Sequence, residues 1–142
     1  MRAIVAGILV SPLLFSAAWA QPARHWVAVN RITMEATGDL TLKGDRLSFG
    51  NDGSIHVRLV RSHARGHWSE TNATEQADIY KVDPPTEPTS SRGDILCNAP
   101  ATYIVLSHPF PSDVEMGVYT GKARPKGDGK DEACANFSYT QG

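Results

Sequence analysis

The chain has 142 residues, of which 41% are hydrophobic and 20% charged, and its formal net charge is −1. A single domain is expected at this length. The near-neutral charge argues against a nucleic-acid partner, because such binders neutralise phosphates with clustered cations. Beyond the N-terminus no apolar run reaches the length of about 18 residues that a membrane-spanning helix needs, so we expect no integral membrane segment there.

The first twenty residues predict a cleaved export signal. Arg2 supplies a positive charge, an apolar stretch follows, and Ala18-Trp19-Ala20 has the small-x-small pattern that signal peptidase reads. We therefore expect a signal peptide over 1–20 and one mature domain over 21–142. The alternative is an N-terminal membrane anchor, but the apolar stretch is short for a span and contains Pro12.

The mature part contains two cysteines, Cys97 and Cys134. An exported protein meets an oxidising compartment, where a lone pair of cysteines usually forms a disulfide. The alternative is a redox or metal pair. A redox pair favours a C-x-x-C spacing, and a metal site needs further cysteine or histidine in register. We therefore predict a Cys97–Cys134 disulfide.

Apolar and polar residues alternate along the mature chain, with turn residues at short intervals, which predicts an antiparallel all-β domain. In chain order, the expected strands are 25–32, 38–43, 46–49, 54–60, 78–82, 101–107, 113–119 and 133–140. About eight short strands suit a single small barrel or a sandwich. The barrel is slightly favoured because successive hairpins close it without an exposed edge.

The alternation also predicts which side chains face the core and which segments are loops. The expected inward residues are Leu40, Leu42, Leu47, Phe49, Ile55, Val57, Leu59, Val114, Met116, Val118, Ala135, Phe137 and Tyr139. The polar segment 61–76 is interpreted mostly as a loop, with at most a helical turn near its end. Three prolines make 83–93 an irregular connection, and the glycine-rich, charged segment 122–132 is expected to be mobile.

The densest group of polar side chains is the candidate contact site for a partner or an anion. It comprises Arg58, Arg61, Arg65, His67 and Trp68. Guanidinium groups bind carboxylate and phosphate through two parallel hydrogen bonds, and an exposed tryptophan beside them is a plausible contact anchor. The alternatives are a solvated strand end for the arginines and a tryptophan that covers one end of the barrel.

The sequence contains no motif typical of catalysis, cofactor binding or metal binding. It has neither a G-x-S-x-G elbow nor a phosphate-binding G-x-x-x-x-G-K loop. His63 and His67 are four residues apart, but Gly66 between them argues against the helix that would place both on one face. We therefore expect no enzyme activity, no cofactor and no metal.

Two stretches together resemble a group of known proteins. One runs from Ala36 to Phe49, and the other from Leu96 to Val105, followed by Val118-Tyr119-Thr120-Gly121 and a last strand with a cysteine. The order is similar to that of small exported proteobacterial proteins of unknown function, which implies export and the cysteine pair but no activity. A weaker similarity, in size, export and strand count, links the chain to periplasmic lysozyme inhibitors, which are small disulfide-bearing β-barrels.

These observations predict a periplasmic or secreted, non-catalytic binding or interaction module. Its partner is an unidentified protein, and an inhibitor-like role is one form the activity could take. The alternative is a lipocalin-like carrier of a small apolar ligand. A carrier needs a barrel interior larger than the inward side chains can fill.

Overall fold

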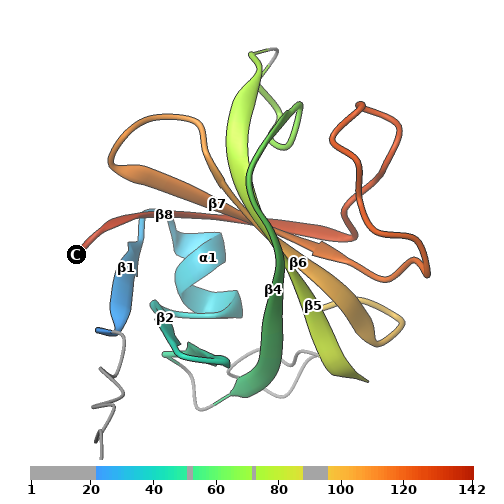
Figure 1. Cartoon of the computed structure of the whole chain (residues 1–142). Coiled ribbons are helices and arrows are strands. Elements are labelled where there is room, and N and C mark those ends of the chain that lie inside the picture. Colours follow the sequence, from blue (N-terminus) through green and yellow to red (C-terminus); the bar gives the residue numbers. More distant parts are fainter. Residues whose placement is uncertain (1–21, 51–52, 72, 88–95) are drawn as a thin grey trace, which may run out of the picture.

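A computed structural model describes residues 22–50, 53–71, 73–87 and 96–142, and these residues form an eight-stranded antiparallel barrel. The elements are β1 (Arg24–Ala28), α1 (Arg31–Ala36), β2 (Leu40–Lys43), β3 (Arg46–Phe49), β4 (Ser54–Gly66), β5 (Glu75–Thr86), β6 (Ala101–His108), β7 (Asp113–Tyr119) and β8 (Ala135–Gln141). Each strand pairs with the next along the chain, and β8 pairs with β1 (Figure 1). Of the two predicted architectures, the barrel is confirmed. The predicted export signal lies outside the described residues.

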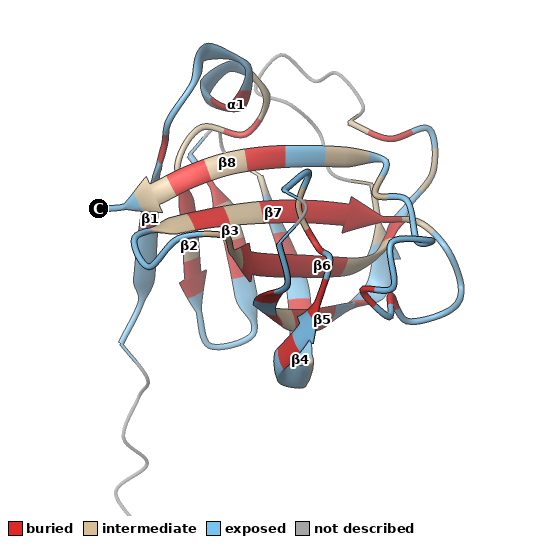
Figure 2. Ribbon diagram, turned by 90° about the horizontal axis from the view of Figure 1, so that it is seen from above, coloured by how far each residue is buried: buried red, intermediate tan, exposed pale blue. Residues whose placement is uncertain are grey.

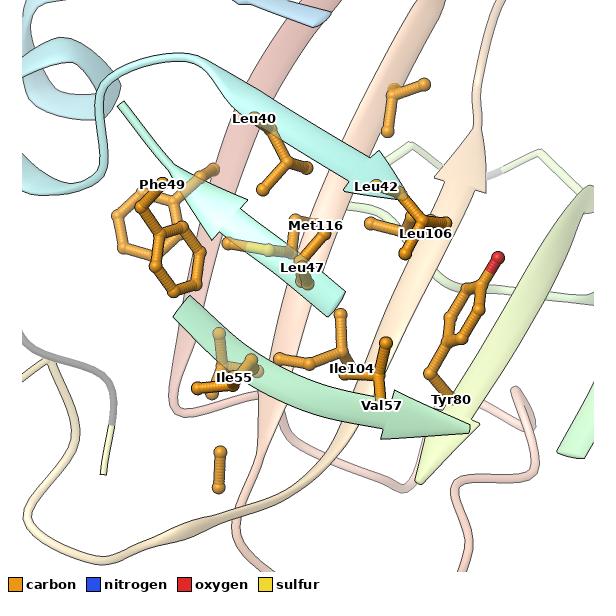
Figure 3. Close-up of a cluster of buried hydrophobic side chains, with 14 of the residues drawn as sticks. Leu40, Leu42, Leu47, Phe49, Ile55, Val57, Tyr80, Ile104, Leu106 and Met116 are labelled. Carbon is orange, nitrogen blue, oxygen red and sulfur yellow. The ribbon is translucent and has the colours of Figure 1, made fainter. Parts of the chain in front are cut away.

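Side chains from every strand fill the barrel interior. Leu40, Leu47 and Met116 are at most 1% exposed, and Figure 3 shows them converging with neighbours from β4, β5 and β6. An eight-stranded barrel is just wide enough for side chains to fill. The predicted inward residues that are buried are Leu40, Leu42, Leu47, Phe49, Ile55, Val57, Val114, Met116, Val118, Phe137 and Tyr139, and Ala135 is partly buried. In Figure 2 this burial is most continuous along β6 and β7.

The predicted first strand, 25–32, is too long, because a helix that the alternation did not predict begins within it. β1 ends at Ala28, and the Asn30 side chain caps α1 by accepting a hydrogen bond from Thr33 N at 2.8 Å. Six residues are too few to display a helical period. The helix lies against β1 and β8, where Thr33 Oγ1 accepts a hydrogen bond from Ser138 N at 3.2 Å. It therefore covers one end of the barrel, and we call the opposite end the mouth.

The prediction of a loop over 61–76 is wrong for most of its length. β4 continues to Gly66, β5 begins at Glu75, and these two residues pair with each other. Two register shifts interrupt the β4–β5 pairing, one between Leu59 and Arg61 and one between Arg61 and Ala64. Such bulges insert unpaired residues and break the two-residue period on which the sequence prediction depended.

Two neighbouring predictions also need adjustment. Leu59 lies opposite the core residue Tyr80 and so is on the inward face as predicted, but it is 50% exposed rather than buried. Part of the predicted irregular connection 83–93 is also strand, since β5 runs to Thr86. The remainder of that segment, from residue 88 onward, lies outside the described residues.

Much of β4 forms an edge of the sheet. β3 pairs with β4 only from Ser54 to His56, so within the described residues the rest of β4 has β5 as its single neighbouring strand. Bulges and charged side chains protect exposed strand edges from adventitious pairing. The arginines of β4 therefore protect this exposed strand edge, a role that requires no partner.

The predicted disulfide is confirmed. Cys97 and Cys134 are bonded, with their Cα atoms 5.9 Å apart. The bond fixes one end of the segment 120–134, and a second attachment holds its middle: His67 N donates to Gly127 O at 2.8 Å, and His67 forms a bridge with Asp128. The glycine-rich segment is thus connected to the end of β4, a contact that its composition did not predict.

Candidate functional site

The strand register separates the arginines predicted to form one site. Arg58 lies opposite Lys81, and Arg61 lies opposite Ile79, so both arginines share the outer face of the sheet. Arg65 lies opposite Gln76, which alternation places on the same face of β5 as the core residue Tyr80. All three arginines are exposed, and the ion pairs among the described residues involve other groups.

His67 and Trp68 lie on a different surface from Arg65. Trp68 is 6% exposed, and its Nε1 donates a hydrogen bond to Ala64 O at 2.9 Å. It packs on a second apolar cluster on the outside of the barrel, together with Ile79 and Tyr119. The expectation of an exposed tryptophan is therefore wrong: its indole covers the side wall of the barrel, because the bulged end of β4 folds it onto the sheet.

The structure instead gathers polar side chains around Arg24 at the mouth. The Arg24 side chain reaches from β1 to β5, where Nη2 donates to the Tyr80 hydroxyl at 2.8 Å and Nη1 lies 3.8 Å from Asp78 Oδ2. Its guanidinium carbon also lies 5.3 Å from the centre of the Trp26 ring, within cation–π range. Arg24 and Tyr80 are 56 residues apart, so sequence spacing gave no signal for this cluster.

His63 completes the cluster through its backbone. Its N–H donates to Asp78 Oδ1 at 3.2 Å, and its φ of 53° lies in the left-handed region that few non-glycine residues adopt. The second register shift of β4 includes this residue. Unusual backbone conformations of this kind are concentrated at binding sites, so His63 marks the mouth as a functional candidate.

Two adjoining pockets lie on either side of Arg24, His63 and Asp78. The first, of about 440 Å³, is also lined by Gln76, Ala77, His108, Pro109, Phe110 and Pro111. The second, of about 340 Å³, is also lined by Pro22, Leu42, Gly44, Leu59, Ser62 and Tyr80. Because the two share these three residues, we treat them as one recess and call it the mouth groove.

The electrostatics of the mouth groove suit binding of a carboxylate or an amide. Burial raises the pKa of Tyr80, an effect that Arg24 opposes and Asp78 reinforces. Tyr80 therefore stays a neutral phenol that accepts from Arg24 and keeps its own proton to donate. Phe110, at the groove's edge, is 60% exposed and adds an apolar contact. Among the described residues, no group of three or more His, Cys, Asp or Glu is placed to hold a metal ion.

Comparison with known proteins gave no match: no family model fits the chain, and no curated protein or solved structure is significantly similar to it. No helix in the described ranges is long and apolar enough to cross a membrane. The fold and the site together define a small antiparallel barrel with one disulfide, a helix over one end and a polar groove at the other.

Proposed function

We propose that this protein is an exported, non-catalytic interaction module that binds an acidic segment of a partner protein in the mouth groove. The carrying observation is the collection of Arg24, His63 and His108 around a single carboxylate, Asp78, beside the exposed ring of Phe110. Arginine and aromatic side chains dominate the binding energy of protein interfaces. A partner carboxylate flanked by an apolar residue complements both features.

The arginines of β4 support the same partner chemistry. Arg65 lies opposite Gln76, a residue of the groove, and is therefore placed to contact a segment that enters it. Arg58 and Arg61 lie further along the same strand and add positive charge nearby. Charges around a binding site steer an oppositely charged partner and raise its association rate. The predicted contact residues of β4 thus remain part of the proposal, in an auxiliary role.

The packed interior favours an interaction module over a carrier. The inward residues Leu47, Ile104 and Met116 are at most 1% exposed and occupy the space that an apolar ligand would need. We therefore expect native mass spectrometry of the purified protein to give the mass of the polypeptide alone. A retained apolar molecule would instead support the carrier.

Export is the remaining part of the proposal. Disulfides persist in oxidising compartments, and the Cys97–Cys134 bond fits that setting. We expect the protein recovered from its native host to begin at Gln21 and to occur in the periplasm or the medium. An intact mass that retains the first twenty residues would contradict the predicted cleavage.

Site-specific photocrosslinking tests the proposed contact surface directly. A photoreactive phenylalanine at position 110 is expected to crosslink one defined partner in the native host, and the product should disappear with Arg65→Glu or at high salt. The matched control carries the same probe at position 32 on α1, where Ile32 is 74% exposed but distant from the mouth. Identical products at both positions, or none at position 110, would overturn the proposal.

A further inference from the structure

A second recess lies on the side wall of the barrel, away from the mouth. It has a volume of about 390 Å³ and is lined by His67, Trp68, Ser69, Glu70, Thr71, Tyr119, Gly129, Asp131, Ala133 and Asn136. It shares no lining residue with the mouth groove. We call it the outer pocket. Two of its lining residues are aromatic and two are acidic, whereas the mouth groove contains Arg24 paired with the single carboxylate Asp78.

The aromatic wall of the outer pocket is held in place by close packing. A Cβ atom added at Gly127 would lie 2.5 Å from Trp68 Cζ2, and one added at Gly66 would lie 3.1 Å from Trp68 Cε2. The indole thus packs closely against both glycines, and its hydrogen bond to Ala64 fixes its orientation. Gly127 also has a φ of +69°, a conformation that glycine adopts without strain.

A buried carboxylate adjoins the outer pocket through one lining residue, although it is not itself part of the lining. Glu75 is 7% exposed, and its Oε1 accepts a hydrogen bond at 2.6 Å from the backbone N–H of Ser69, which lines the pocket. Its other oxygen, Oε2, is buried and has no hydrogen-bond partner among the described residues. Leaving a buried polar group unpaired costs about 1–3 kcal/mol, and more when the group is charged. The unpaired oxygen therefore adds uncompensated negative potential beside the pocket.

Further acidic groups reinforce the negative charge. Burial, together with Glu75 and Glu70, raises the pKa of Glu115 to about 7. Glu115, Gly117 and Tyr119 follow one another on the same face of β7, and the Tyr119 ring lies over Gly117, since a Cβ there would be 3.0 Å from its Cε2. The acidic side chains and the phenol ring therefore surround one region.

The other titratable groups near the outer pocket are a phenol, an imidazole and a lysine side chain. Burial, then Asp131 and Glu115, raises the pKa of Tyr119 to about 12, so this phenol stays uncharged. His67 lines the pocket but is exposed, and Lys130 is an exposed residue of the adjacent loop, next to Asp131. Burial and both acidic neighbours therefore act on the pKa of the Glu115 carboxyl in the same direction.

We propose that the outer pocket binds an organic cation, the guanidinium or ammonium end of an arginine, a lysine or a free amine. Aromatic rings attract such cations through their faces, and carboxylates accept their N–H donors. The exposed lining residues Glu70 and Asp131 supply carboxylate acceptors, and the Glu75 carboxylate, with its unpaired Oε2, adjoins them through Ser69. A metal ion suits the pocket less well, because the described acidic and histidine side chains do not converge as a ligand set.

Titration of the disulfide-intact mature protein, followed by NMR of the Trp68 indole N–H, tests this proposal. The probes are N-acetylarginine amide and N-acetyllysine amide as side-chain mimics, spermidine as a free amine, and CaCl₂ or ZnCl₂ as metal controls. We expect one side-chain mimic or spermidine to shift the indole signal saturably at pH 8. The preferred probe distinguishes a protein partner from a free amine.

Matched variants identify the residues responsible. Glu75→Gln and Glu115→Gln each remove one carboxylate near the pocket. We expect each substitution to weaken binding of the organic cation by about tenfold. Lowering the pH from 8 to 5.5 should have a similar effect on the unmodified protein. Glu132→Gln is the matched control, because it removes an acidic side chain of the segment 120–134 that neither lines the pocket nor acts on the pKa of Glu115, and it should change affinity less than twofold.

Three results would overturn the proposal. The first is that no organic cation shifts the Trp68 indole signal saturably. The second is that Glu132→Gln weakens binding as much as Glu115→Gln, and the third is that Ca²⁺ or Zn²⁺ shifts the same signal with higher affinity than any organic cation. The pH comparison needs no substitution, so it remains decisive if Glu75→Gln fails to fold. Because the mouth groove is not involved, Arg24→Gln should leave this binding unchanged, and failure here does not affect the proposed partner site.

Discussion

The mouth groove and the outer pocket are lined by residues of different elements, and their charged groups are arranged differently. At the mouth, Arg24 contacts Asp78 and Tyr80, so positive and negative groups offset each other. Beside the outer pocket, burial together with Glu75 and Glu70 raises the pKa of the Glu115 carboxyl, and Glu75 Oε2 has no hydrogen-bond partner among the described residues. A site whose charged groups pair with one another stabilises the folded protein. A site with an unpaired buried charge destabilises it until a ligand pairs with that charge.

β4 connects the two sites. Leu59 and His63 line the mouth groove, while Ala64 and Trp68 pack on the outer cluster a few residues later. The register shifts between Leu59 and Ala64 produce this change of face, because a bulge twists a strand and re-aims the side chains after it. The difference between the sites thus originates in two extra residues of one strand.

The largest expected effect comes from replacing both cysteines with alanine. In the chain-entropy account, a cross-link spanning 37 residues stabilises the fold by about 4 kcal/mol. Urea denaturation should show a loss of that order. Cys134 ends the segment that packs on Trp68, so the Trp68 indole signal should lose more dispersion than that of Trp26. Equal loss at both tryptophans would contradict the view that the two regions are held separately.

Gly127→Ala is the next largest perturbation, and it affects the outer pocket alone. The added methyl group overlaps the Trp68 ring and occupies a positive φ, which together should cost about 2–3 kcal/mol in unfolding free energy. Gly129→Ala is the matched control, because it shares the positive φ but meets no atom within 4 Å. It should cost about 1 kcal/mol. Thermal or urea denaturation of both variants measures the difference.

The raised pKa of Glu115 makes stability pH-dependent. Between its ordinary value of 4.5 and the folded value of about 7, the native protein holds a proton that the unfolded chain has released. Stability should therefore fall as the pH rises through this window. Solvent screening of a half-buried carboxyl limits the effect to about 1 kcal/mol. Glu115→Gln should flatten this part of the stability profile, and an unchanged profile would refute the assignment.

The smallest expected effect is at the mouth. Arg24→Gln removes the hydrogen bond to Tyr80 and the ion pair with Asp78, both half-exposed, at a cost of about 1 kcal/mol. Arg24 lowers the pKa of Tyr80, so the substitution should raise that pKa further. The Tyr80 ring signals in an NMR pH titration report the change. A lower Tyr80 pKa in this variant would show that Arg24 does not stabilise the phenolate.

The parts of the fold that were predictable are those with uninterrupted alternation. β3 and β7 were predicted with their observed bounds because their inward residues alternate in sequence, and β6 was predicted to within one residue because it is a continuous apolar run. The disulfide was predicted because an exported protein meets an oxidising compartment and the mature chain has two cysteines. α1 was missed because it is one and a half turns long, and the end of β4 was missed because its bulges remove the period.

The candidate sites were less predictable, since they depend on register. Arg58, Arg61, Arg65, His67 and Trp68 are close in sequence, yet the pairing of β4 with β5 distributes them over separate surfaces. Arg24 and Tyr80 come from opposite walls of the barrel and carry no shared motif. The Asn30 cap was the one local signal that a closer examination of helix starts could have used.

The Cys97–Cys134 bond also determines how the protein responds to proteolysis. It closes a covalent ring that contains β6, β7 and the segment 120–133. A protease that cuts once within 122–132 opens the ring, but both fragments stay joined through the two sulfur atoms. β8 therefore stays covalently attached to the rest of the chain after such a cut until a reductant is present. In an environment rich in proteases and poor in thiols, a single cut in this exposed loop does not release the C-terminal strand.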